Sequence, residues 1–113
     1  MTFWRSQKSE QQPVHSILIE DGILHYYRPG GALSRCDIDD LGAATLKVLN
    51  DEVYWHLIDN QGAFVLIPER CPDIGRLRRY LSSWRGFNYD GLLNFDPERQ
   101  SEALLWPLQQ KRA

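Results

Sequence analysis

The sequence has few cysteines and no long apolar run, and both absences limit what the chain can be. Among its 113 residues only Cys36 and Cys71 are cysteines, too few for a disulfide framework and without CxxC spacing. We expect two reduced thiols, and a single bridge between them is the alternative. No segment approaches the roughly 18 apolar residues of a membrane span, and residues 1–12 lack the apolar core of a signal peptide. These features predict a cytoplasmic protein.

The chain also lacks an excess of basic charge. Its 13 Lys and Arg are outnumbered by 15 Asp and Glu, and the formal net charge is −2. Domains that bind nucleic acid usually present a broad positive field, so that class of partner is disfavoured. The 42% hydrophobic and 25% charged residues are typical of a globular protein. We expect one domain over residues 13–108, with a flexible arm at 1–12 and a frayed tail at 109–113.

The first half of the chain has the pattern of antiparallel strands separated by turns. Asp21 and Gly22 predict a tight hairpin because both residues tolerate a positive φ, and Gly62 suits the left-handed position of a later turn. Residues 43–49 suit either a short helix or a strand, and we favour a strand because turn residues flank the segment. The other predicted strands are 14–20, 23–28, 33–38, 53–58 and 63–67.

The hydrophobic period changes after Pro68. Apolar residues then recur at helical spacing, at Ile74, Leu77, Leu81 and Trp84. Pro72 and Asp73 favour a helix start, and Gly86 is a suitable stop. A short helix from residue 88 or 89 to 94, with Leu92 and Leu93 pointing inward, and a strand at 103–106 follow. The predicted class is α+β: a bent antiparallel sheet of about six strands capped by a C-terminal amphipathic helix, then a short helix and a final strand.

This order of elements resembles that of pleckstrin-homology-like domains over about residues 14–85. The most specific part spans 36–68 and contains an acidic corner (Asp37, Asp39 and Asp40), a strand, a turn and a Gly-containing hairpin. The two strands of that hairpin are Trp55-His56-Leu57-Ile58 and Phe64-Val65-Leu66-Ile67. The resemblance implies a strongly bent antiparallel sheet that a helix caps at one end.

Two segments depart from that family. Its phosphoinositide-binding members present Lys and Arg around the first hairpin, whereas the tip here is Glu20-Asp21-Gly22. Two carboxylates repel an inositol phosphate, so the usual lipid site is not expected. The end of the chain, from Phe87 to Trp106, is similar instead to that of small bacterial proteins with an aromatic-rich ending, and this second resemblance implies no function.

We predict no catalytic, cofactor-binding or metal-binding residues, because the sequence contains no GxSxG, HExxH, P-loop or GxGxxG pattern. His15, His25 and His56 lie on predicted strands, where we expect structural or surface roles; a small hydrolase or metal enzyme is the weaker alternative. Carboxylates in the middle of the chain lie at predicted turns, which predicts a solvated acidic rim. They are Asp37, Asp39, Asp40, Asp51, Glu52 and Asp59.

Arginines gather around the main predicted helix, where Asp73 is the one acid. They are Arg70, Arg76, Arg78, Arg79 and Arg85. On a helical period Arg76 and Arg79 project from the face opposite the apolar stripe, with Arg78 and Arg85 on one flank. The alternatives are a solvated face that pairs in part with the acidic corner, and a surface that recognises carboxylate or phosphate through planar guanidinium groups.

Adjacent aromatic residues add a second indication. Neighbours in a strand point to opposite faces, so one member of Tyr26-Tyr27 and one of Tyr54-Trp55 must face a second layer, a partner or solvent. Our leading hypothesis is a non-catalytic, bacterial-type cytosolic domain that binds another protein or a second copy of itself, as an adaptor, a subunit or an immunity-type inhibitor. The alternative is a pleckstrin-homology-like module that docks peripherally on anionic lipid head groups through the arginine helix. The predicted partner-binding residues are Arg76, Arg78, Arg79, Arg85, Tyr27 and Tyr54.

Overall fold

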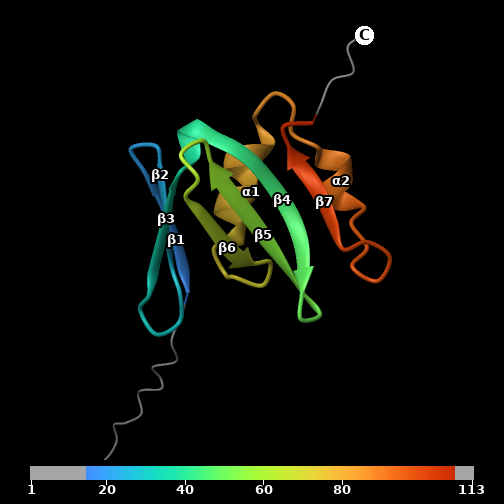
Figure 1. Cartoon of the computed structure of the whole chain (residues 1–113), viewed down its shortest axis with the longest axis horizontal. Coiled ribbons are helices and arrows are strands. Elements are labelled where there is room, and N and C mark those ends of the chain that lie inside the picture. The colour runs from blue at the N-terminus through green and yellow to red at the C-terminus, as the bar shows by residue number, and fades with distance from the viewer. Residues whose placement is uncertain (1–14, 109–113) are drawn as a thin grey trace, which may run out of the picture.

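The computed structural model describes residues 15–108, which form an α+β fold with two antiparallel sheets and two helices (Figure 1). The predicted arm at 1–12 and tail at 109–113 lie outside the described residues. The strands are β1 (Ser16–Glu20), β2 (Ile23–Tyr27), β3 (Leu33–Asp37), β4 (Leu41–Leu49), β5 (Glu52–Asp59), β6 (Phe64–Pro68) and β7 (Glu102–Trp106). The helices are α1 (Ile74–Ser82) and α2 (Tyr89–Leu93), and a short 3-10 helix, η2 (Ile38–Asp40), precedes β4.

The three-stranded sheet has the order β1-β2-β3 and begins with the predicted hairpin. Asp21 and Gly22 have φ of 54° and 76°, the left-handed conformation that a two-residue turn between twisted strands requires. The resulting register places Leu18 opposite His25, as the turn predicts. The first hairpin is therefore encoded locally.

The predicted six-strand meander is interrupted at the acidic corner, because β3 and β4 are not paired. Residues of that corner form η2, where the side chain of Asp37 accepts a hydrogen bond from the backbone N–H of Asp40 at 3.2 Å. Ile38 is fully buried inside this turn. The corner redirects the chain, so two sheets form in place of one continuous sheet.

The second sheet has four strands in the order β6-β5-β4-β7. Residues 43–49 are confirmed as a strand within β4, and Ala44 and Leu46 supply its buried positions. The last strand, β7, returns to pair with the free edge of β4, so the end of the chain completes the sheet.

Helix α1 lies across the back of this sheet (Figure 1) and buries the predicted stripe of Ile74, Leu77 and Leu81. Asp73 is the N-cap residue of the helix, but its side chain makes no capping hydrogen bond; its Oδ2 accepts the backbone N–H of Ile17 at 3.0 Å and ties the helix start to β1. The helix ends at Ser82, four residues before the predicted stop at Gly86. Fully buried sheet residues complete this core: Trp55, Leu57, Val65 and Ile67.

The short helix and the last strand are confirmed, but Leu93 does not point inward. Leu92 packs against the core, whereas Leu93 is 65% exposed. Successive residues of an α-helix are rotated by about 100°, so Leu93 points away from the direction in which Leu92 meets the core.

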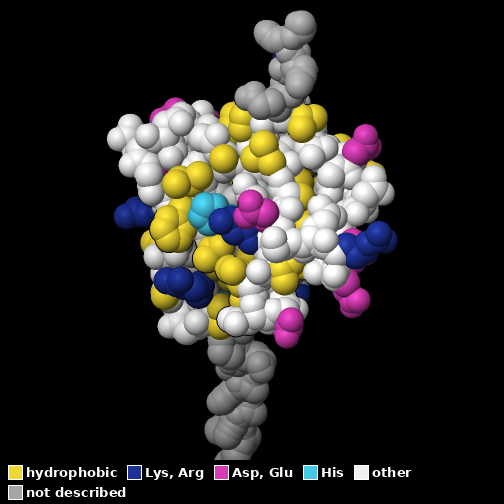
Figure 2. Space-filling view, turned by 45° about the vertical axis from the view of Figure 1, so that its right-hand side comes forward, with side chains coloured by type: hydrophobic (Ala, Val, Ile, Leu, Met, Phe, Trp, Pro, Cys, Tyr) yellow, Lys and Arg dark blue, Asp and Glu magenta, His cyan; other side chains and the backbone are white. Residues whose placement is uncertain are grey.

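Within the part of the chain that the structure describes, no helix lies over the front face of the four-stranded sheet (Figure 1). Phe64 and Leu104 are 54% and 40% exposed, and Phe64 lies beside His56 with ring centroids 5.4 Å apart. Figure 2 shows hydrophobic side chains gathered around a histidine, with a basic and an acidic side chain beside it. The fold thus has one covered sheet face and one largely open face.

Candidate functional site

The outer side of α1 presents the two arginines that the helical period predicts there. Arg76 and Arg79 are exposed, because Ile74 and Leu77 turn the opposite side toward the sheet. Within residues 15–108 neither guanidinium has a carboxylate at ion-pair distance. A Cβ built at Gly75 would lie 3.9 Å from Nη1 of Arg79, so that guanidinium lies back along the first helical turn. We call Arg76 and Arg79 the arginine face.

Two of the three neighbouring arginines, Arg70 and Arg78, are paired. Nη2 of Arg78 lies 2.6 Å from Oε2 of Glu69, and Nε of Arg70 bonds the carboxylate of Glu52. The Glu52 contact raises the pKa of Arg70. Arg85 is exposed in the turn after α1, without an ion pair among the described residues. Of the predicted partner-binding cations, Arg78 is therefore the one that the fold already uses.

Glu69 has a second contact, because it also accepts the indole N–H of Trp55. Trp55 is fully buried, so this bond satisfies a donor that water cannot reach. The same carboxylate therefore holds a core side chain of β5 and a helical arginine, Arg78. No sequence motif indicated this role for Glu69.

Among residues 15–108, no carboxylate of the acidic corner lies at ion-pair distance from an arginine. Instead, Tyr80 of α1 donates its hydroxyl hydrogen to Oδ1 of Asp39 at 2.8 Å, and this bond raises the pKa of Tyr80. The alternative of a helix face neutralised by that corner is thus not what the structure describes for Arg76 and Arg79.

Asp59 differs from its predicted place on a solvated rim. Its side chain is buried and accepts backbone N–H groups from Asp37 at 2.8 Å, Gln61 at 2.9 Å and Ala63 at 3.0 Å. These bonds, that from Asp37 foremost, lower the pKa of Asp59. Asp59 therefore joins the β5–β6 turn to β3 as an ionised structural group.

The adjacent aromatic pairs point to opposite faces, as predicted. Tyr26 is 2% exposed and Tyr27 38%, while Trp55 is fully buried and Tyr54 half-buried. Tyr54 and Tyr27 both lie away from the arginine face, on β5 and β2. The predicted partner-binding residues are consequently not one surface.

The three histidines are separated along the fold. His15 is buried with Nδ1 2.9 Å from the Tyr26 hydroxyl, and His25 pairs opposite Arg35. His56 lies on the open sheet face, where burial and the nearby Lys47 lower its pKa. Among the described residues, no three His, Cys, Asp or Glu side chains are placed to share a metal ion.

Comparison of the chain with protein-family models, curated proteins and solved structures finds no match. Neither helix in the described part of the chain has the length and apolar character needed to cross a membrane. Function is therefore inferred from the residues and their geometry alone.

Proposed function

We propose that this is a non-catalytic domain that binds an acidic surface of another protein through the arginine face of α1, with Arg85 at its edge. The observation that carries the proposal is the contrast between Arg76 and Arg79, exposed with no ion pair among residues 15–108, and Arg70 and Arg78, which are paired. The fold uses two of these cations and leaves the others available. Exposed guanidinium groups form bidentate hydrogen bonds with carboxylates, which gives both charge and geometric selectivity.

Charge complementarity favours an acidic partner over nucleic acid or membrane. The chain as a whole is slightly acidic, with a net charge of −2, so the exposed arginines of α1 make a local positive patch and not a broad positive field. Basic residues near an anionic membrane contribute about 1 kcal/mol each, so two or three of them anchor a domain only weakly without apolar insertion. The large exposed hydrophobic side chains of the described region lie elsewhere: Leu18, Tyr27, Leu33, Leu49, Phe64, Tyr89, Leu93, Leu104 and Leu108.

The pleckstrin-homology-like resemblance supplies the competing proposal. It rests on the order of strands followed by a helix, while the two sheets and the returning β7 differ from a single capped meander. If the domain works as such a module, anionic lipid head groups would occupy the arginine face. The first hairpin tip, Glu20-Asp21-Gly22, offers no cation for them.

Fluorescence anisotropy with a labelled oligo-glutamate peptide tests the proposal, with vesicles of phosphatidylcholine and phosphatidylserine as the second arm. The test variant is Arg76→Gln/Arg79→Gln, and the matched control is Arg35→Gln/Arg99→Gln, which removes the same charge from exposed positions elsewhere. We expect salt-sensitive peptide binding that the test variant weakens about tenfold or more, since each charge-assisted bond contributes about 1.5–3 kcal/mol.

Three outcomes contradict the proposal. The first is an equal loss in the matched control, which would show only a response to net charge. The second is loss of peptide binding on Phe64→Ser with none on Arg76→Gln/Arg79→Gln, which would move the site to the open sheet face. The third is arginine-dependent binding to phosphatidylserine vesicles without peptide binding, which would favour the lipid alternative.

A further inference from the structure

A pocket of about 330 Å³ lies where the end of β2 meets β5 and β6. Its volume falls within the range of about 300–1,000 Å³ that small-molecule sites occupy. The lining combines buried side chains with exposed ones from four separate segments: His15, Tyr26, Arg28, Pro29, Leu49, Asn50, Tyr54, Leu66, Pro68 and Arg70. The arginine face of α1 takes no part in it, so a ligand bound in this pocket would be independent of the proposed protein partner.

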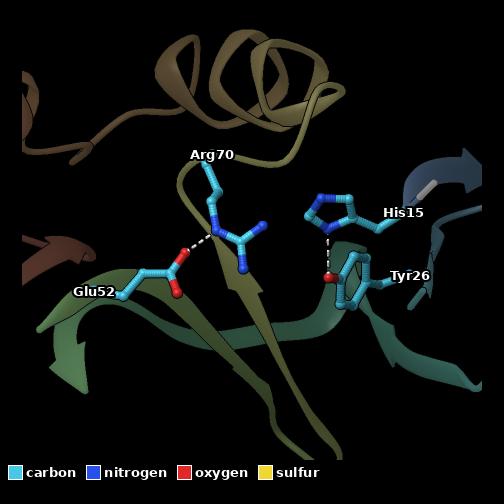
Figure 3. Close-up of polar contacts among 4 residues, drawn as sticks. All are labelled: His15, Tyr26, Glu52 and Arg70. Atoms are coloured by element: carbon cyan, nitrogen blue, oxygen red, sulfur yellow. Dashed lines mark hydrogen bonds and ion pairs between the residues drawn. The ribbon is translucent and has the colours of Figure 1, made fainter. Parts of the chain in front are cut away.

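Two guanidinium groups line this pocket. Arg70 uses Nε to bond Glu52, and in the described part of the chain its two Nη atoms make no hydrogen bond. Figure 3 shows the guanidinium of Arg70 between Glu52 and the pair formed by His15 and Tyr26. Arg28 is exposed and makes no ion pair within residues 15–108. No lining residue carries a carboxylate, and Glu52, which is outside the lining, pairs with Arg70.

The same pocket has a buried polar pair at its inner side. His15 and Tyr26 are 8% and 2% exposed, and Nδ1 of His15 lies 2.9 Å from the Tyr26 hydroxyl. Burial raises the pKa of Tyr26 to about 12, so the hydroxyl stays protonated at neutral pH. The hydrogen of this bond can come from either side: the hydroxyl donates to Nδ1 and the imidazole hydrogen is on Nε2, or Nδ1–H donates to the hydroxyl oxygen. Within residues 15–108 the pair has no other hydrogen-bond partner, so its unused buried donor is Nε2–H in the first arrangement and the Tyr26 O–H in the second.

Apart from Asn50, the remaining walls are apolar or aromatic. Leu49, Leu66 and Pro68 lie along the pocket together with the ring of Tyr54. A ligand that uses both kinds of wall combines an anionic group with a compact apolar body.

We propose that this pocket binds a small organic oxyanion, with its charged group held by Arg28, Arg70 and the His15–Tyr26 pair and its apolar body against Leu49 and Leu66. Carboxylates and phosphate monoesters share this chemistry, since both accept hydrogen bonds from guanidinium groups. The ligand is therefore specified by charge and shape.

Titration of the isotopically labelled domain with benzoate, phenyl phosphate and neutral benzamide, followed by NMR, tests the assignment. We expect saturable shifts of the backbone amides of the lining residues with at least one of the two anions, and binding of benzamide about tenfold or more weaker. Arg28→Gln should weaken anion binding about tenfold, whereas the matched Arg35→Gln, an exposed arginine of β3 outside the pocket, should leave it unchanged.

Tighter binding of phenyl phosphate would assign the ligand to the phosphate monoesters, and tighter binding of benzoate to the carboxylates; both support the pocket. The inference is overturned if neither anion shifts these amides, if benzamide binds as well as benzoate, or if Arg28→Gln and Arg35→Gln behave alike. Arg28 is exposed, so its substitution leaves the core intact, and an unchanged thermal midpoint verifies that the variant is folded.

Discussion

Replacement of Glu69 should lower the stability of the domain and strengthen its binding to an acidic peptide, because the Glu69 carboxylate makes two different contacts. It pairs with Arg78 at 2.6 Å and accepts the indole N–H of the fully buried Trp55. The Glu69 and Arg78 side chains are 39% and 37% exposed, so their ion pair is partly solvated and contributes roughly 0–1 kcal/mol. An indole N–H left without an acceptor costs roughly 1–3 kcal/mol.

Two substitutions separate these contributions. Glu69→Gln removes the charge but keeps a side-chain oxygen for Trp55, so the free energy of unfolding should fall by about 0–1 kcal/mol. Glu69→Ala removes both contacts and should cost about 1–3 kcal/mol more than Glu69→Gln. Urea denaturation followed by circular dichroism measures both, with the midpoint changing and the slope constant. Equal stability of the two variants would refute the assigned role of the indole bond.

The same pair of variants bears on binding. Loss of the carboxylate frees Arg78, which lies on the flank of α1 beside the arginine face. Glu69→Gln should therefore bind oligo-glutamate more tightly than the natural sequence although it is less stable. Weaker peptide binding by a folded Glu69→Gln would contradict the view that unpaired arginines of α1 are the binding groups.

Two further predictions concern the core and the open sheet face. Leu77→Ala should lower the free energy of unfolding by about 2–5 kcal/mol, because Leu77 is fully buried between α1 and the sheet, while Arg76→Ala stays within about 0.5 kcal/mol; similar urea midpoints would contradict this packing. The pKa of His56 in the folded protein is below its ordinary value of 6.5, so the unfolded state binds more protons as the pH falls below 6.5. The contribution of His56 to stability is therefore complete above pH 6.5. It is lost as the pH falls through the folded-state pKa. Urea denaturation from neutral to mildly acidic pH should show a smaller loss of unfolding free energy in His56→Gln than in the natural sequence. The same pH dependence in both proteins would contradict the assigned role of His56.

Local signals in the sequence predicted most elements. The hairpin at Asp21 and Gly22 needs only two residues with positive φ, and the buried stripe of α1 follows from the spacing of Ile74 and Leu77. Residues 43–49 were ambiguous between helix and strand because their pattern was short, and pairing on both edges of β4 resolves them. No local sequence pattern in either segment indicates the long-range pairing of β7 with β4.

The features missed from the sequence depend on contacts between distant residues. The sequence places Asp59 at a turn, but its side chain is buried and accepts the backbone N–H of Asp37, so this bond joins a strand of one sheet to a strand of the other. The pocket brings His15 and Arg70 together from opposite ends of the β region, so no spacing rule could reveal it. The arginine face was predictable because a single helix defines it, but the pairing of Arg78 required the position of Glu69.

The most direct measurement of the central claim is NMR mapping of the labelled domain with the oligo-glutamate peptide. If the arginine face binds the peptide, we expect saturable chemical-shift changes concentrated on the backbone amides of residues 75–83. These changes should disappear in Arg76→Gln/Arg79→Gln. Shifts confined to the sheet strands, or the same shifts in that double variant, would contradict the claim that α1 carries the binding surface.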